Sequence, residues 1–187
     1  MRANKIDFAI NCAAFTDVPR AEEDISLAKD INGIAAGNVA SACQKNDVRL
    51  LHFSTDYVFD GCKEGAYSED EETHPLNIYG KSKLIGEQEV AKNCERHKIF
   101  RLQWLYGKHG SNFIDKIIQF YSDNGMIKIV EDQFGSPCST EFVAKTVVTA
   151  LQRWDEAEDG VYHLTHDDSC SWYDRDWETI LIIPLSE

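Results

Sequence analysis

Short apolar runs alternate with longer segments of helical periodicity along most of the chain. The apolar runs predict buried strands near residues 6–11, 49–54, 98–102, 127–130 and 161–164. The segments between them predict helices at 25–46, 78–94, 112–124 and 140–154. Because strands that alternate with helices favour parallel pairing through helical crossovers, the pattern predicts an α/β fold with a parallel sheet.

Two segments fall outside this alternation. The polar stretch 61–75 contains Gly, Asp, Glu and Pro and predicts a loop. Near the end of the chain, Ser171-Trp172-Tyr173-Asp174 has the character of a helix start, but the apolar run 180–185 that follows has no amphipathic face. The tail after Asp174 therefore yields no structural prediction.

The composition predicts one acidic, core-forming chain. Its 187 residues, 43% of them hydrophobic, suffice for one core and are too few for two full domains. The net charge of −13 disfavours nucleic acid and anionic membranes as partners, and no apolar run approaches the roughly 20 residues that cross a bilayer. Six dispersed cysteines without metal-ligand spacing predict reduced thiols. We therefore expect a cytoplasmic protein.

The strongest chemical signal is Tyr79-Gly80-Lys81-Ser82-Lys83. Tyr79 and Lys83 are four residues apart at the start of a predicted helix, which places both side chains on one face. A nearby ammonium favours the phenolate, so the pattern predicts a lowered pKa for Tyr79 and a pair that exchanges a proton with a carbonyl or hydroxyl. Taken alone, the spacing also fits a tyrosine and a lysine that share a helix face by chance.

A second signal strengthens the first. Ser54 and Thr55 follow directly after a predicted strand, and ligands of open parallel sheets bind beyond the carboxyl ends of strands. A hydroxyl at that place polarises a substrate oxygen. The conjunction predicts a hydroxyl, phenol and ammonium triad of Thr55, Tyr79 and Lys83.

At this point the sequence resembles the extended short-chain dehydrogenases and, among them, the dTDP-4-dehydrorhamnose reductases. The likeness runs from about Ile6 to Asp174. The matching phrases include Asn11-Cys12-Ala13-Ala14-Phe15-Thr16, Ala21-Glu22, Ser54-Thr55-Asp56-Tyr57-Val58-Phe59, Tyr79-Gly80-Lys81-Ser82-Lys83, Phe100-Arg101-Leu102-Gln103-Trp104 and Asp132-Gln133-Phe134-Gly135.

The resemblance implies a Rossmann-like, doubly wound parallel sheet and reduction of the C4 ketone of a dTDP-linked 4-keto-6-deoxy sugar by NADPH or NADH. It implies an incomplete dinucleotide-binding domain over 1–105 and a substrate-binding portion, interleaved with the last Rossmann elements, over 106–187. It also implies catalytic roles for Thr55, Tyr79 and Lys83. The residues implied for cofactor binding are Asn11, Ala13, Ala14, Tyr79 and Lys83, and those implied for the dTDP-sugar are Thr55, Asp56, Tyr57, Trp104 and Asn112.

Some of these residues have a structural alternative. Trp104 also fits a core aromatic, and Asn112 also fits a helix cap. Relatives that hold Mg²⁺ at a subunit interface through glutamates imply the same for Glu141 and are compatible with a homodimer. A surface helix glutamate is the simpler interpretation of Glu141.

The sequence also departs from the family pattern. It contains no glycine-rich phosphate loop of the form Gly-x-x-Gly-x-x-Gly, so the first βαβ unit is predicted to be absent and the chain is expected to bind a dinucleotide weakly or not at all. Pro19 stands where the family has an acid, and Gln103 stands where it has a small hydroxyl residue.

Three rival functions share parts of this pattern. A 4,6-dehydratase needs a pair of acids after the threonine, and Thr55 is followed by one acid and then Tyr57. An epimerase uses the same tyrosine and lysine and stays open. A non-catalytic regulatory subunit, like the beta subunit of methionine adenosyltransferase, which resembles the same family, also stays open.

Overall fold

The computed structural model describes residues 5–109, 116, 119, 122–124 and 130–172. The chain divides into two compact units, which are described separately. The first comprises Met1–Leu102 and Thr149–Leu164, and the second comprises Gln103–Val148 and Thr165–Glu187. Within the described part of the chain, no helix has the length and apolar character needed to cross a membrane.

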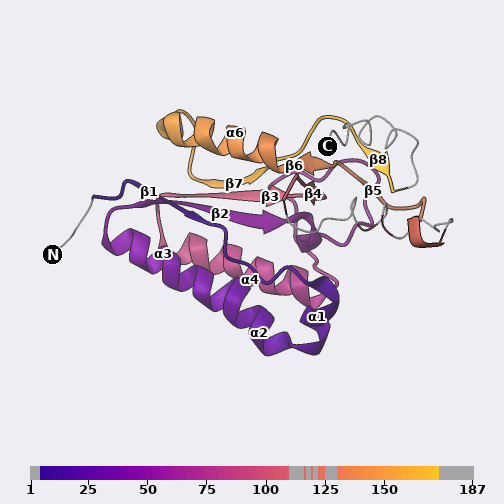
Figure 1. Cartoon of the computed structure of the whole chain (residues 1–187). Coiled ribbons are helices and arrows are strands. Elements are labelled where there is room, and N and C mark those ends of the chain that lie inside the picture. Colours follow the sequence, from indigo (N-terminus) through magenta and orange to yellow (C-terminus); the bar gives the residue numbers. More distant parts are fainter. Residues whose placement is uncertain (1–4, 110–115, 117–118, 120–121, 125–129, 173–187) are drawn as a thin grey trace. The chain divides into compact units, whose positions relative to one another are not determined.

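The first unit is built on a four-stranded parallel sheet (Figure 1). Its strands are β1 (Phe8–Asn11), β2 (Arg49–Thr55), β3 (His97–Leu102) and β7 (Gly160–His163), and they pair in the order β1-β2-β3-β7. The register places Asn11 beside His52. The carboxyl ends of β1 and β2 therefore meet at one edge of the sheet, and the predicted α/β class with a parallel sheet is confirmed.

The helices of the first unit follow the predicted order, with two differences. The segment predicted as one helix over 25–46 contains α2 (Ile25–Lys29), a π-helical turn η1 (Asp30–Ile34) and α3 (Ala35–Lys45). A short helix α1 (Val18–Glu23) precedes it, with Asp17 as N-cap and Pro19 in its first turn. The helix predicted over 78–94 is α4 (Ile78–Asn93). The apolar periodicity did not reveal α1, because its start depends on capping chemistry.

Successive side chains along the strands point to opposite faces of the sheet, and in the first unit both faces pack against other elements. Leu50 and Ile99 face α3 and α4, which lie along one face of the sheet (Figure 1). On the opposite face, Phe8 packs against Trp154 at 5.7 Å between ring centroids, in the 3-10 turn η3 (Trp154–Glu156). The buried cluster beneath α3 and α4 consists of Ala36, Ala40, Cys43, Val48, Leu50, Val90, Cys94 and Ile99.

The second unit contains two small sheets. β4 (Leu105–Tyr106) pairs in parallel with β6 (Cys138–Ser139), and β5 (Phe134–Gly135) pairs antiparallel with β8 (Cys170–Ser171). α6 (Thr140–Gln152) begins in this unit, where the Ser139 hydroxyl accepts from the Phe142 amide at 3.1 Å and caps the helix.

Several predictions about the second unit change or remain outside the structure. The helix start predicted at Ser171 is wrong, because Ser171 ends β8 and the Trp172 amide donates to the Gln133 carbonyl at 3.3 Å. The elements predicted at 112–124 and 127–130 lie largely outside the described residues. The tail after Asp174 lies wholly outside them.

Two glycines bring η1 and α4 into close contact. A Cβ at Gly86 would lie 2.2 Å from the Asn32 carbonyl oxygen, and a Cβ at Gly33 would lie 2.7 Å from Ile85 Cγ2. A heavy atom cannot approach a backbone carbonyl so closely, so this packing requires glycine at position 86. At Gly37 the added Cβ would lie 3.0 Å from Glu89 Cβ, which is a longer approach than the one at Gly86.

We predict that Gly86→Ala lowers the free energy of unfolding by about 1–3 kcal/mol, the range typical of overpacking. Urea denaturation followed by circular dichroism measures the change. Gly37→Ala, in the neighbouring contact between α3 and α4, is the control and should cost less, because its closest approach is 3.0 Å and not 2.2 Å. Equal stability of Gly86→Ala and the parent would contradict the packing at this contact.

Candidate active site

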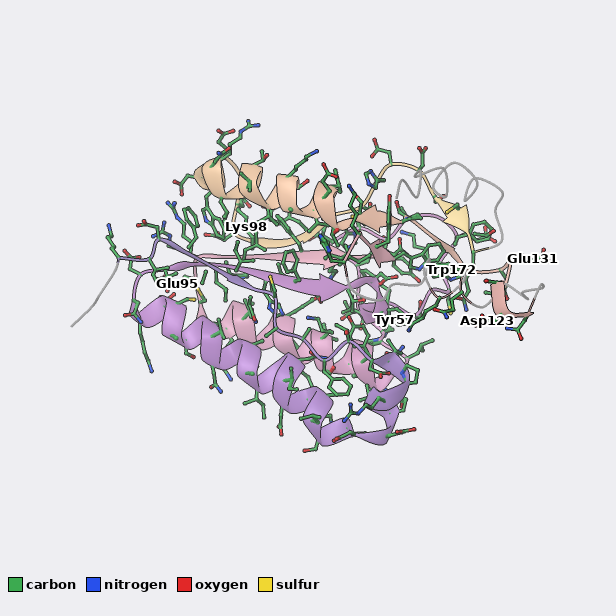
Figure 2. The ribbon with its side chains drawn as sticks, in the orientation of Figure 1. Tyr57, Glu95, Lys98, Asp123, Glu131 and Trp172 are labelled. Carbon is green, nitrogen blue, oxygen red and sulfur yellow. The ribbon has the colours of Figure 1, made fainter. Side chains whose placement is uncertain are left out.

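The carboxyl end of β2 carries the first group of predicted site residues. Thr55 ends the strand, and Asp56 and Tyr57 follow in the 3-10 turn η2 (Asp56–Val58). The Thr55 hydroxyl donates to Asp56 Oδ1 at 3.0 Å and accepts from the Tyr57 amide at 3.2 Å. Figure 2 shows Tyr57 beside this end of β2. The turn therefore fixes Thr55 as a buried hydroxyl at the edge of the sheet.

The start of α4 brings Tyr79 to the same place. Asn77 caps the helix by accepting from the Gly80 amide at 2.7 Å, and Glu22 of α1 accepts from the Ile78 amide at 2.7 Å. A Cβ at Gly80 would lie 2.1 Å from the Tyr57 carbonyl oxygen, so glycine permits η2 and α4 to touch. The rings of Tyr57 and Tyr79 then meet edge to face at 5.7 Å.

Burial governs the acidity of Tyr79. Desolvation raises its pKa to about 12, hydrogen bonding with the Thr55 hydroxyl opposes this rise, and the charge of Asp56 adds to it. The expected lowering of this pKa by Lys83 is therefore wrong for the protein alone. The interaction with Thr55 brings the Tyr79 phenol to the end of β2 that carries the Thr55 hydroxyl, and the catalytic triad stays a prediction.

Lys83 lies one turn further along α4 and is only 2% exposed. Its Nζ donates to the Phe53 carbonyl oxygen at 2.5 Å, which ties the helix to β2. Burial lowers the pKa of Lys83 to about 8, and the charge of Glu87 opposes the shift. The side chain therefore releases its proton more readily than an ordinary lysine does.

The segment after β1 forms the neighbouring edge of the candidate site. The Asn11 side-chain oxygen accepts from the Ala13 amide at 3.2 Å, and its Nδ2 lies 3.1 Å from His52 Nδ1. Because Nδ2 can only donate, His52 Nδ1 accepts and the ring proton lies on Nε2. Ala13 and Ala14 are exposed and extend no further than Cβ, so a flat ring can approach the backbone here.

His52 itself is buried beneath this edge. Burial lowers its pKa to about 3, and the charge of Lys83 adds to the effect. Its Nε2 has no hydrogen-bond partner in the part of the chain that the structure describes. The ring is therefore neutral, and it holds Asn11 through one nitrogen.

A buried asparagine in the π-helical turn η1 connects the segment after β1 with the start of α4. The Asn32 side-chain oxygen accepts from the Phe15 amide at 2.8 Å, and its Nδ2 donates to the Phe15 carbonyl at 3.0 Å and to the Ser82 hydroxyl at 2.9 Å. Ser82 in turn donates to the Tyr79 carbonyl at 2.7 Å. Sequence reasoning missed Asn32, and its signal was an asparagine beside Gly33 inside a predicted helix, where π-helical turns often mark functional sites.

The remaining predicted site residues lie elsewhere. Trp104 belongs to the second unit, where it adopts a positive φ of 44° and stacks on Trp172 at 3.5 Å between ring centroids. Asn112 lies outside the described residues. Gln103, also in the second unit, accepts from the Ser136 amide at 2.7 Å.

Nothing in the described residues supports a metal at Glu141. Its carboxylate pairs with Lys145 at 2.7 Å on an exposed helix face. No group of three His, Cys, Asp or Glu side chains that could hold a metal ion occurs in the described ranges. The magnesium site stays a prediction.

Comparisons with known proteins agree on one family. The family model described as "RmlD substrate binding domain" matches residues 1–180. The chain is 34% identical over 178 residues to a dTDP-4-dehydrorhamnose reductase of Salmonella typhimurium, covering 93% of this chain and 59% of that protein. It is 39% identical over 166 residues to a dTDP-4-keto-6-deoxy-D-glucose reductase of Streptomyces niveus, covering 88% and 57%.

Solved structures show the same likeness. A dTDP-4-dehydrorhamnose reductase from Clostridium acetobutylicum superposes with a TM-score of 0.87 at 37% identity, covering 94% of this chain and 61% of that one. Another, from Bacillus anthracis in complex with NADP, gives a TM-score of 0.82 at 39% identity, covering 93% and 61%. The chain thus spans about three fifths of the length of these relatives.

We predict that Asn32→Ala lowers the free energy of unfolding by about 1–3 kcal/mol, because it leaves buried backbone groups of Phe15 without partners. Hydrogen exchange of the Phe15 amide should accelerate at the same time, and NMR measures both effects. Asn38→Ala, at an exposed position of α3, is the control and should change neither quantity. An unchanged exchange rate at Phe15 would refute the contact.

We predict that His52 makes the fold sensitive to acid. Its pKa is lowered from 6.5 to about 3 in the folded protein. Between these two pH values the unfolded chain binds a proton at this histidine and the folded chain does not. Stability is therefore lost as the pH falls through this window. In His52→Gln the midpoint of urea unfolding should fall less between pH near 7 and about 5. His74→Gln, at an exposed histidine, should leave the full loss in place.

Proposed function

The chain belongs to the RmlD substrate binding domain family, and from this premise we propose that it reduces the C4 ketone of dTDP-4-dehydrorhamnose to give dTDP-rhamnose. NADPH or NADH would be the reductant. One observation carries the proposal. The partly buried Tyr79 interacts with Thr55 at the end of β2, and the buried Lys83 follows one turn later on the same helix face.

Tyr79 is suited to donate a proton. Its raised pKa of about 12 keeps the phenol protonated at neutral pH, so a proton is available when negative charge develops on the sugar oxygen. Thr55 would hydrogen-bond the same oxygen and orient it toward the phenol. Lys83 would hold the nicotinamide ribose, and its charge would stabilise the phenolate that remains.

The residues after β1 fit the nicotinamide half of the cofactor. The bound cofactor would supply the hydride. Asn11 fixes the Ala13 amide, and the small side chains of Ala13 and Ala14 leave the approach to the backbone open. The NADP complex of the Bacillus anthracis relative supports a dinucleotide of this class. The choice between NADH and NADPH depends on residues that follow the glycine-rich loop in the family, and this sequence contains no such loop.

Asp56 and Tyr57, at the end of β2 in the first unit, would contact the sugar nucleotide. For Trp104 and Asn112 the family resemblance implies the same ligand. The positive φ of Trp104 is uncommon for a bulky residue and is typical of functional positions. The relatives from Salmonella typhimurium and Streptomyces niveus are named for two different dTDP-4-keto sugars. Their names support a dTDP-linked 4-keto-6-deoxy sugar, and the preferred isomer must be measured.

The test is NADPH oxidation with each of the two dTDP-4-keto sugars, with product identification by mass spectrometry and NMR. The assay uses the chain as it stands and, in parallel, the chain joined at Ile6 to the glycine-rich opening segment of a relative. Net reduction of either ketone supports the proposal. Isomerisation without NADPH consumption would indicate an epimerase. Saturable nucleotide binding without turnover in both proteins would indicate a regulatory role, and either outcome would overturn the reductase.

We predict that Tyr79→Phe lowers turnover roughly 10²-fold or more while cofactor affinity stays nearly unchanged, because the proton donor is lost and the ring is kept. Lys83→Met should weaken cofactor binding as well. Steady-state kinetics and nicotinamide fluorescence measure the two effects. Tyr162→Phe is the control, since this phenol lies on β7 and donates to the Glu158 carbonyl. Equal turnover in Tyr79→Phe and the parent would remove Tyr79 from the mechanism.

A further inference from the structure

A buried ion pair lies one turn beyond Lys83. Glu87 follows it by four residues on α4 and is 5% exposed, and Arg101 on β3 is 6% exposed. Arg101 Nε donates to Glu87 Oε1 at 2.9 Å, and its Nη2 donates to Glu87 Oε2 at 2.7 Å. Both carboxylate oxygens are thus held by one planar fork, which leaves Glu87 little rotational freedom.

Arg101 is itself fixed from its other side. Its Nη1 lies 3.3 Å from His163 Nε2 on β7, and its guanidinium lies over the Phe59 ring at 5.0 Å from the centroid. Glu69 accepts from the His163 amide at 2.9 Å, so the loop between η2 and α4 is fastened to the same strand. The position of Glu87 is therefore set by the sheet as well as by its own helix.

Among the described residues, Glu87 is the group that supplies negative charge near Lys83. His52 approaches from β2 and is neutral, since its pKa is about 3. The Phe53 carbonyl accepts from Nζ but carries no formal charge. Tyr79 is protonated at neutral pH, and Asp56 and Tyr57 of η2 act on Tyr79. The charge of Glu87 acts on Lys83 directly and favours the ammonium form.

We propose that Glu87 is a positioning residue for Lys83, held in place by Arg101, and that its carboxylate keeps the buried ammonium charged. The role rests on the proposed function, in which the ammonium holds the cofactor and tunes Tyr79. Burial favours the neutral amine, and a fixed carboxylate one helical turn away offsets that cost. Arg101 balances the charge of Glu87, so no unpaired anion is buried between α4 and the sheet.

The test is a pH titration of Lys83 by NMR in the chain labelled with ¹³C and ¹⁵N at lysine, with Lys83→Met identifying its signal. Glu87→Gln keeps the shape of the side chain and one acceptor for Arg101. We expect the pKa of Lys83 to fall below its value of about 8 in the parent. Glu141→Gln is the matched control, because it removes an exposed i,i+4 partner of Lys145 and should leave Lys83 unchanged.

A second variant covers the case in which Glu87→Gln does not fold, since it leaves Arg101 buried without its carboxylate. Glu87→Gln combined with Arg101→Gln leaves no unpaired guanidinium and should still lower the pKa of Lys83, by less than Glu87→Gln because a positive charge is removed together with the negative one. An unchanged pKa of Lys83 in either folded variant would overturn the proposal. So would a shift of equal size in Glu141→Gln, because it would show a general effect of net charge.

The kinetic readout separates this inference from the proposed function. If the enzyme is active, Lys83 must carry its proton, so activity is present below its pKa and is lost as the pH rises through it. The alkaline limb of the kcat/KM profile should therefore move to lower pH in Glu87→Gln. Absence of reductase activity in the parent would refute the function, while the NMR titration would still decide the role of Glu87.

Discussion

The side-chain amide of Asn32 is the interaction on which the arrangement of the candidate site depends. It satisfies both backbone groups of Phe15 and also holds Ser82, which in turn bonds the Tyr79 carbonyl. The amide is 1% exposed, so water cannot replace these bonds. The segment after β1 and the first turns of α4 are therefore fixed relative to each other, and the proposed cofactor side and acid side of the site share one asparagine.

Burial acts in opposite directions on the two titrating groups of α4. It raises the pKa of Tyr79 and lowers that of Lys83, because in each case it favours the uncharged form. A protonated phenol is what the proposed reduction needs, so burial alone prepares Tyr79. Lys83 needs the opposite form, and this is where Glu87 and Arg101 matter. On this face of α4, desolvation keeps Tyr79 protonated, whereas Lys83 depends on a fixed negative charge to stay protonated.

The sequence predicted the parts of this protein that depend on periodicity. The strands ending at Asn11 and Thr55 and the helix carrying Tyr79 and Lys83 follow from apolar runs and helical spacing, and the edge of the sheet follows from parallel pairing. The π-helical turn at Asn32 was not predicted, because one extra residue in a turn leaves the apolar pattern almost unchanged. The pKa of Tyr79 was predicted in the wrong direction, since spacing reveals neighbours but not the loss of solvent. The positive φ of Trp104 has no sequence signature, because tryptophan carries no preference for that region.

The first unit is made of two stretches of chain, and this order has a consequence during synthesis on the ribosome. β1, β2, β3 and α4 emerge first, whereas β7, which pairs with β3, emerges only after residues 103–148 of the second unit. Until then the Arg101 guanidinium has its carboxylate but not His163, and the outer edge of β3 is open to pairing with other strands. The nascent chain thus passes through an interval in which an unpaired strand edge exposes it to pairing with the wrong partner.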